Sequence, residues 1–155
     1  MNQYYRVHAV IDLDAICHNI REVKRVVGEG VKVMPVIKAD GYGHGAVPLA
    51  EMFEETPYIW GYAVACMGEA RTLRAHGIKK PILILGCVFP DEYEEMVEKE
   101  IRAAVYTEEM AQGMAEAAAR SGKIAFLHIK IDTGMGQIGA TMFVGGGVLD
   151  APRTH

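Results

Sequence analysis

The sequence predicts an α/β fold in which parallel strands are joined by crossover helices. Short apolar runs alternate with longer amphipathic runs along the chain, and the alternation continues without reversal. A chain of 155 residues is also long enough to bury roughly two thirds of its unfolded surface, so one domain is expected. Open doubly wound sheets and β/α barrels both show this alternation, and periodicity alone does not distinguish them.

The amino-terminal elements follow from their hydrophobic periods. Apolar residues recur every three or four positions in the first helix, and Asp14 is its expected N-cap. Pro35 has no N–H for a sheet ladder, so the sequence leaves the strand pairing around it open. In chain order we expect a strand at 7–13, a helix at 14–27, a strand at 33–37 and, after the turn GYGHG, a helix at 47–54.

The remaining elements continue the same alternation. Glycine readily adopts the left-handed cap conformation, so helices are expected to end at Gly77 and at Gly122. Residues 140–155 show neither period. We expect strands at 62–66, 81–85, 102–106 and 125–131, alternating with helices at 68–75, 91–100 and 108–120.

Composition and charge argue against several classes of protein. A net charge of -4 with mixed signs gives no broad basic surface, so nucleic acid is not an expected partner. The amino terminus has no signal-peptide pattern, and the apolar runs are far shorter than the roughly 20 residues of a membrane span. We therefore expect a cytoplasmic protein with no membrane partner. Cys17, Cys66 and Cys87 are odd in number and widely spaced, which favours reduced core thiols over disulfides or a metal site.

The segment VIKADGYGHG, residues 36–45, is the first candidate site. Lys38 directly follows an apolar strand, where α/β folds place their ligands, and burial favours the neutral amine that attacks an aldehyde. The glycines could bring backbone amides to a phosphate, and Tyr42 and His44 could donate hydrogen bonds. The alternative is a solvated lysine beside a flexible turn, because the spacing matches neither GxGxxG nor a Walker pattern.

The segment HIKIDTGMGQIG, residues 128–139, is the second candidate site. In a strand His128, Lys130 and Asp132 share one face, and the two isoleucines between them share the other. Polar side chains that face a barrel interior need partners or a ligand. The same pattern also fits an exposed, half-polar edge strand, and the residues alone leave both interpretations open.

Both segments resemble motifs of the alanine racemase family. KADGYGHG is similar to the family's pyridoxal-phosphate lysine motif and KIDTGMG to its second barrel motif; IDLDAICHNI, GYAVACMGEARTLRAHGI and KKPILILG also match. The resemblance, which runs from Tyr5 to Gly139, implies a partial TIM-type β/α barrel of about the first five barrel strands. Residues 1–139 would form this barrel portion without the carboxyl-terminal β domain, residues 7–13 would lie outside the barrel, and residues 140–155 would be an unrelated tail after a truncation.

The resemblance also implies roles for four residues. Lys38 would hold pyridoxal phosphate as a Schiff base and act as one of two catalytic bases, and Tyr42 would lie near the cofactor phosphate. The second base would be a tyrosine of the β domain. Lys130 matches a lysine that is often carbamylated in the family. Gln137 stands where the family has an arginine that helps position the substrate carboxylate, and an amide cannot make that bidentate, charge-assisted contact.

The resemblance implies interconversion of L- and D-alanine, which supplies D-alanine for peptidoglycan. We expect impaired activity for a chain that ends before the second base. The alternative is a non-catalytic, pyridoxal-phosphate-binding partial barrel. A single-domain cofactor barrel fits less well, because such barrels have about 250 residues. Serine and other small amino acids are alternative substrates. An unclosed sheet leaves unpaired strand edges, so a homo-oligomer is expected.

Overall fold

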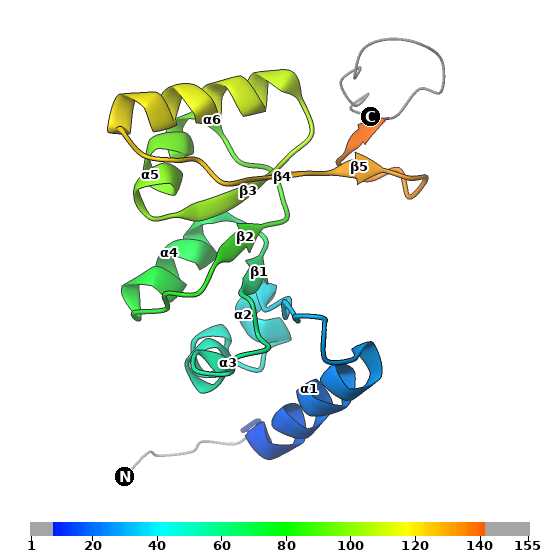
Figure 1. Ribbon diagram of the computed structural model, residues 1–155. Coiled ribbons are helices and arrows are strands. Elements are labelled where there is room, and N and C mark those ends of the chain that lie inside the picture. Colours follow the sequence, from blue (N-terminus) through cyan, green and yellow to red (C-terminus); the bar gives the residue numbers. More distant parts are fainter. Residues whose placement is uncertain (1–7, 142–155) are drawn as a thin grey trace.

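A four-stranded parallel sheet forms the centre of the computed structural model, which describes residues 8–141 (Figure 1). The spatial order of the strands equals their order in the chain. In a doubly wound sheet the spatial order of the strands reverses at a switch point, whereas in a barrel it follows the chain throughout. The order found here is therefore that of a barrel portion. The strands are β1 (Tyr62–Val64), β2 (Ile82–Ile84), β3 (Ile101–Val105) and β4 (Leu127–Ile129).

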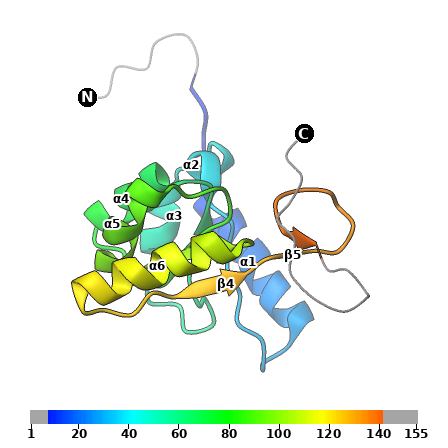
Figure 2. The same ribbon diagram turned by 90° about the horizontal axis from the view of Figure 1, so that it is seen from above.

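The helices follow one another in chain order along this sheet (Figures 1 and 2). Alternate strand residues are buried with them in one core cluster: Tyr62, Val64, Ile82, Ile84, Ile101, Ala103 and Val105. The opposite face is the one that a closed barrel would enclose. The helices are α1 (Leu13–Val27), α3 (Ala46–Phe53), α4 (Met67–Ala75), α5 (Tyr93–Glu98), which the short 3-10 helix η1 (Pro90–Glu92) precedes, and α6 (Glu108–Ser121).

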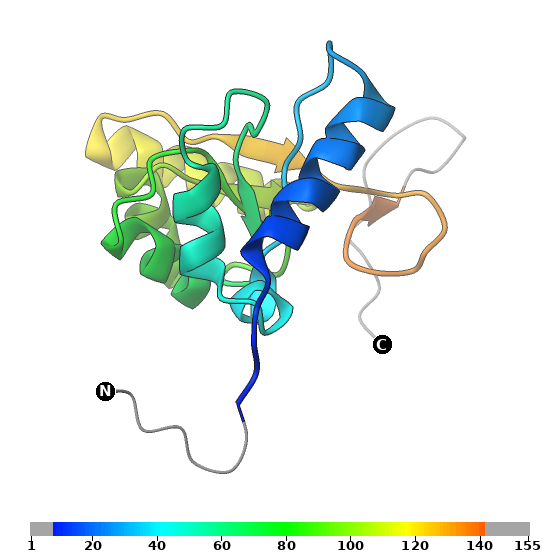
Figure 3. The same ribbon diagram turned by 90° about the horizontal axis from the view of Figure 1, so that it is seen from below.

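The start of the chain differs from the expectation. The N-cap of α1 is Asp12, whose Oδ1 accepts a hydrogen bond from the Ala15 amide at 3.0 Å, and Asp14 lies within the first turn. Residues 8–12 are exposed and extend away from α1 without strand structure (Figure 3), so the expected strand is wrong for them; residue 7 is outside the described part. A strand needs a ladder partner, and no β-ladder or isolated bridge among residues 8–141 includes this segment.

The segment at residues 33–37 adds a fifth, incomplete strand beside β1. It pairs through isolated parallel bridges, one of them between Val36 and Ala63. The Pro35 carbonyl accepts from the Ala63 amide at 2.9 Å, and the Ile37 amide donates to the Ala63 carbonyl at 2.8 Å. The segment therefore pairs with its neighbour on both sides of Pro35, and the expected partial barrel of about five strands is confirmed.

The last predicted strand is divided in two. After β4 the chain continues into β5 (Ile131–Asp132), which pairs with β6 (Ala140–Thr141) and projects away from the main sheet (Figures 1 and 2). The strand β6 occupies the first two residues of the segment predicted to be a tail. Residues 142–155, the rest of that segment, lie outside the described residues.

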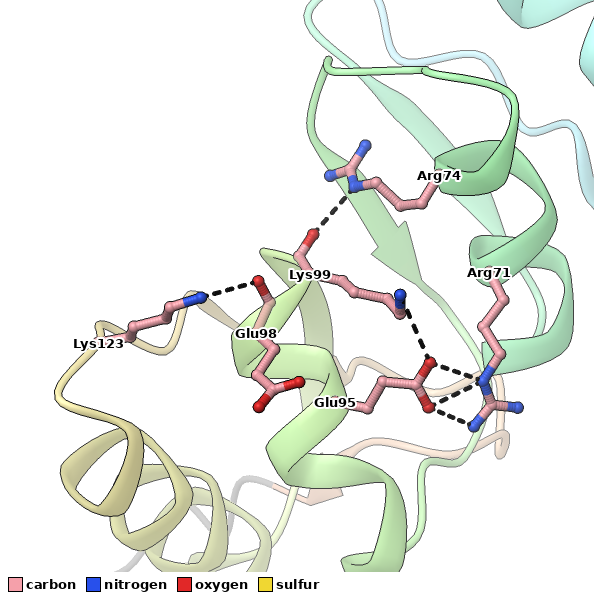
Figure 4. Close-up of polar contacts among 6 residues, drawn as sticks. All are labelled: Arg71, Arg74, Glu95, Glu98, Lys99 and Lys123. Atoms are coloured by element: carbon pink, nitrogen blue, oxygen red, sulfur yellow. Dashed lines mark hydrogen bonds and ion pairs between the residues drawn. The ribbon is translucent and has the colours of Figure 1, made fainter.

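Charged side chains connect α4 to α5 and to the turn before β3 (Figure 4). Arg71 and Glu95 form an ion pair with 2.8 Å between Nη2 and Oε2. Arg74 is half-buried, and this burial lowers the pKa of its guanidinium. Its N–H groups compensate by donating to four backbone carbonyls, those of Ile78 at 2.7 Å, Lys80 at 2.9 Å, Lys99 at 2.9 Å and Glu100 at 3.2 Å.

The three cysteines are free thiols, as expected, but two of them are not in the core. Cys17 is half-buried, with 3.3 Å between its Sγ and the Sδ of Met52. Cys66 and Cys87 are exposed because they lie in the loops that follow β1 and β2. Within residues 8–141 no group of three His, Cys, Asp or Glu side chains could hold a metal ion, and no helix is long and apolar enough to cross a membrane.

Candidate cofactor site at Lys38

Lys38 directly follows the first barrel strand, at the carboxyl end where β/α barrels place their ligands. The preceding residue, Ile37, is buried in the core, and Lys38 itself is half-buried. The Lys38 Nζ lies 5.9 Å from the centre of the Tyr42 ring, and that ring is 61% exposed. The structure therefore brings together the two predicted cofactor residues.

A left-handed helical turn, α2 (Lys38–Tyr42), carries this lysine. The φ angles are 50° at Ala39, 51° at Asp40 and 54° at Tyr42, all in the left-handed region. That conformation costs a residue other than glycine about 1–2 kcal/mol. The left-handed backbone of these three residues therefore costs about 3–6 kcal/mol of conformational free energy, which the surrounding structure must offset.

Two carboxylates hold the turn in place. Glu69 of α4 accepts from the Ala39 amide through Oε1 and from the Ala65 amide through Oε2, each at 2.7 Å. Asp40 Oδ1 accepts from the Ala46 amide at 2.8 Å, at the first residue of α3. The turn is thus bonded both to the end of β1 and to the start of α3. Sequence reasoning missed both carboxylates, although Glu69 lies within a stretch that resembles the family.

The glycines of GYGHG serve the turn rather than a phosphate. Gly41 is buried, and a Cβ atom there would lie 2.9 Å from Leu49 Cδ1, so a larger residue would require the Leu49 side chain to move. The expectation that these amides approach a phosphate is therefore wrong in this structure. Each glycine amide already donates to a backbone carbonyl, Gly41 to Ile37 at 2.9 Å, Gly43 to Asp40 at 3.1 Å and Gly45 to Asp40 at 2.8 Å.

The barrel-facing side of β3 and β4 carries a cluster of a cation and three rings. The Arg102 guanidinium carbon lies 4.8 Å from the centre of the Trp60 ring and 4.4 Å from that of Phe126. The His128 ring lies 5.9 Å from the Trp60 ring. Burial lowers the pKa of His128, and the charge of Arg102 lowers it further. His128 is thus part of a cluster of rings around Arg102 and has partners on the interior face.

The second candidate segment, residues 128–139, has features of both a polar barrel-interior strand and an exposed edge strand. Lys130 is half-buried and follows β4, which is the outer strand of the sheet in the described part of the chain. Ile129 and Ile131, on the other face, are 74% and 45% exposed. The segment therefore combines polar residues on the barrel side with an open edge.

Asp132 organises the TGMG turn. Its Oδ1 accepts from the Gly134 amide at 2.8 Å and from the Gly136 amide at 3.2 Å, and these bonds lower the pKa of the carboxyl. Gln137 follows the turn and is exposed. Within residues 8–141 no hydrogen bond joins Gln137 to Lys130 or to Lys38, so the structure does not bring the second segment together with the first.

A mostly apolar pocket of about 410 Å³ lies apart from Lys38, between the β3–α6 segment, β4 and β6. Tyr106 lines it, and burial raises the pKa of this phenol to about 12, helped by a contact of 3.2 Å between its hydroxyl and Cys87 Sγ. The sequence contained no signal for this pocket, because its walls come from three separate segments.

Comparison with protein families identifies the chain. The family model for the alanine racemase N-terminal domain matches residues 11–148, which is most of the sequence. The chain belongs to the alanine racemase family. The match extends nine residues beyond residue 139, the boundary that the sequence predicted.

Individual relatives agree with this family assignment. The chain is 47% identical to alanine racemase 2 of Caldanaerobacter subterraneus subsp. tengcongensis over 133 residues, covering 86% of this chain and 34% of that protein. It is 43% identical to the alanine racemase of Desulforamulus reducens, covering 87% of this chain and 36% of that protein. The chain thus spans about a third of the length of these relatives.

Solved structures show the same barrel portion. The alanine racemase of Clostridium difficile 630 superposes with a TM-score of 0.80 at 40% identity, covering 83% of this chain and 34% of that one. The histidine racemase of Leuconostoc mesenteroides subsp. sake superposes with a TM-score of 0.71 at 30% identity, covering 81% of this chain and 33% of that one. The first half of the barrel is therefore shared by racemases named for different amino acids.

Proposed function

We propose that this chain supplies the cofactor-binding lysine and one catalytic base of a pyridoxal-phosphate-dependent amino-acid racemase. The observation that carries the proposal is the environment of Lys38. Lys38 is half-buried at the carboxyl end of the first barrel strand, and it begins a strained turn that two carboxylates hold. Backbone strain kept at a ligand-facing position supports a functional role rather than a solvated surface lysine.

The residues around Lys38 fit pyridoxal phosphate in part. The lysine offers the primary amine that an aldehyde requires. The Tyr42 ring lies beside that amine, and its exposed hydroxyl is free to donate to the cofactor. The glycine amides of the turn are already bonded within the turn. We therefore assign the aldehyde end to Lys38, keep Tyr42 as the residue near the cofactor phosphate, and assign the remaining phosphate donors to residues outside this turn.

Lys38 would also move the proton in the reaction. Bound pyridoxal phosphate supplies an electron sink that makes the hydrogen on the substrate's α-carbon acidic. The Lys38 amine takes that proton on one face of the substrate or returns it there, according to the direction of the reaction. Inversion requires a second acid or base on the opposite face, which we assign to residues outside 8–141.

The second segment has a supporting role in this proposal. We assign Gln137 to the substrate carboxylate, to which its amide N–H can donate. We keep carbamylation as the proposed modification of Lys130, which is half-buried beside the barrel interior. A neutral amide binds a carboxylate more weakly than a guanidinium does, so weak substrate binding is part of the proposal.

Alanine is the proposed substrate, because the relatives with the highest identity quoted above are named alanine racemases. D-alanine for peptidoglycan and a cytoplasmic location belong to the same proposal, and the free thiols fit a reducing compartment. We also propose a homo-oligomer. The open edge at β4 leaves backbone groups without a ladder partner in the described chain, and Ile129 beside them is exposed.

The test is a pyridoxal phosphate titration followed by visible absorbance, borohydride reduction and peptide mapping. We expect saturable labelling of Lys38, loss of that label in Lys38→Ala, and an unchanged label in Lys32→Ala, which alters an exposed lysine. Scattered labelling that does not saturate would refute the cofactor site. The same samples are then assayed for conversion of L-alanine to D-alanine.

A second candidate function is a non-catalytic, pyridoxal-phosphate-binding partial barrel. It is favoured by one observation, that of the predicted site residues the described structure brings only Tyr42 beside Lys38. Saturable label on Lys38 without any production of D-alanine would establish this candidate. Racemisation by a verified, uncontaminated preparation would refute it.

A further inference from the structure

We propose that Glu69 is a positioning residue for Lys38, and this inference rests on the cofactor role proposed above. Glu69 lies in the first turn of α4, 30 residues beyond the amide that it binds at Ala39. That amide belongs to the peptide that immediately follows Lys38. A bond to it restricts rotation of this peptide and so fixes the direction in which the lysine side chain leaves the backbone.

Both oxygens of the carboxylate are used, and they bind two different segments. Oε1 accepts from the Ala39 amide and Oε2 from the Ala65 amide, each at 2.7 Å. Distances of this size are typical of charge-assisted bonds to an ionised acceptor. Ala65 directly follows β1, the strand beside the one that ends at Lys38. Glu69 therefore connects the lysine turn to the sheet as a bridge between neighbouring strand ends.

The geometry requires a glutamate. A glutamine would keep one acceptor oxygen but would place an NH₂ group against the other backbone N–H, which would then have no acceptor. An aspartate is one methylene shorter and could not span both amides. Within the described residues Glu69 forms no ion pair with a lysine, arginine or histidine, so these amides are the partners that the structure gives its charge.

The position also allows variants that fold. Glu69 is half-buried and lines a pocket of about 260 Å³ together with Asp40, Val64 and Thr72. Its side chain is not part of the core cluster that joins the helices to the sheet. Replacing it therefore leaves that cluster intact and changes mainly the support of the turn.

The experiment compares the wild-type chain with Glu69→Gln and with the matched control Glu109→Gln, an exposed glutamate of α6. Hydrogen exchange of the Ala39 and Ala65 amides reports whether the clamp exists. Pyridoxal phosphate titration with borohydride trapping at Lys38 reports whether the clamp positions the lysine. We expect Glu69→Gln to speed hydrogen exchange at one or both amides. We also expect it to raise the pyridoxal phosphate concentration at half-saturation about tenfold, the effect of losing one charge-assisted bond. The control should change neither measurement.

The possible outcomes separate this inference from the function on which it rests. Unchanged exchange in Glu69→Gln would show that the clamp is absent and would overturn the inference. Faster exchange with unchanged labelling would overturn the positioning role. If Glu69→Gln does not fold, Glu69→Asp is measured in the same way, and retention of wild-type labelling by it would also overturn the inference. Absence of saturable label in the wild type would refute the cofactor function, while the exchange data alone would still decide whether the clamp exists.

Discussion

Replacing Ala39 by glycine should stabilise the protein, contrary to the usual effect of glycine in a helix. Ala39 has φ 50° and ψ 49°, so its backbone is in the left-handed region, where the Cβ atom lies too close to the following carbonyl oxygen. Glycine has no Cβ and adopts this region freely. The hydrogen bond from the backbone amide to Glu69 does not depend on the side chain, so it should persist in the variant.

The expected magnitude follows from two opposing effects. Removing the left-handed strain contributes about 1–2 kcal/mol to the free energy of unfolding. Glycine loses more backbone entropy on folding, which costs roughly 0.5–1 kcal/mol. The net gain is therefore about 0.5–1 kcal/mol. The matched control is Ala115→Gly at an exposed position in the right-handed helix α6, which should destabilise by about 1 kcal/mol.

Urea unfolding followed by far-ultraviolet circular dichroism measures both changes. With a slope of about 2 kcal/mol per molar, Ala39→Gly should raise the midpoint by roughly 0.25–0.5 M. Ala115→Gly should lower it by about as much. If the two variants lose equal stability, the turn is not left-handed in solution, and the argument from stored strain fails.

Three further predictions concern burial, pH and substrate binding. Arg74→Met should lower the free energy of unfolding by about 3 kcal/mol, because four carbonyls lose a charged donor. The control Arg120→Met breaks an exposed ion pair with Glu94 and should lower it by under about 1 kcal/mol. Equal midpoints in urea would contradict this contrast. Tyr106 has its pKa raised to about 12 from 10.0, so its contribution to stability is complete below pH 10 and is lost as the pH rises towards 12. Tyr106→Phe should therefore show a shallower loss of stability across that range, and parallel profiles for the two proteins would argue against a buried phenol. Gln137→Arg should strengthen alanine binding to the cofactor-loaded protein about tenfold, measured as a lower alanine concentration at half-saturation in an absorbance titration. An unchanged titration would place this residue away from the substrate carboxylate.

Much of the fold was predictable because strand and helix periods are local properties. The strands from β1 to β4 and the helices from α3 to α6 lie within about two residues of their expected positions. The early strand was predicted wrongly because an apolar run forms a strand only within a β-ladder, and no ladder in the described part of the chain includes residues 8–12. The cysteines were misplaced for a related reason, since apolar neighbours in sequence do not make a loop residue buried.

The candidate site was predictable in Lys38 and Tyr42 but not in the residues that hold their turn in place. Lys38 was found because it follows an apolar strand and lies in a motif that resembles a family. The use of the glycine amides was not predictable, because the turn closes on its own carbonyls. The carboxylate of Glu69 was missed because its partner at Ala39 is 30 residues away, and only the packing of α4 against the strand ends brings them together.

The sequence by itself determined the alternation of strands and helices and the position of the lysine after a strand, because both depend on neighbouring residues. The tertiary structure decided between a doubly wound sheet and a barrel portion, since that choice depends on which strands lie side by side. It also decided the hand of the turn at Lys38. Left-handed backbone is unfavourable for alanine, aspartate and tyrosine in isolation, so it persists only where distant carboxylates and packed helices offset its cost.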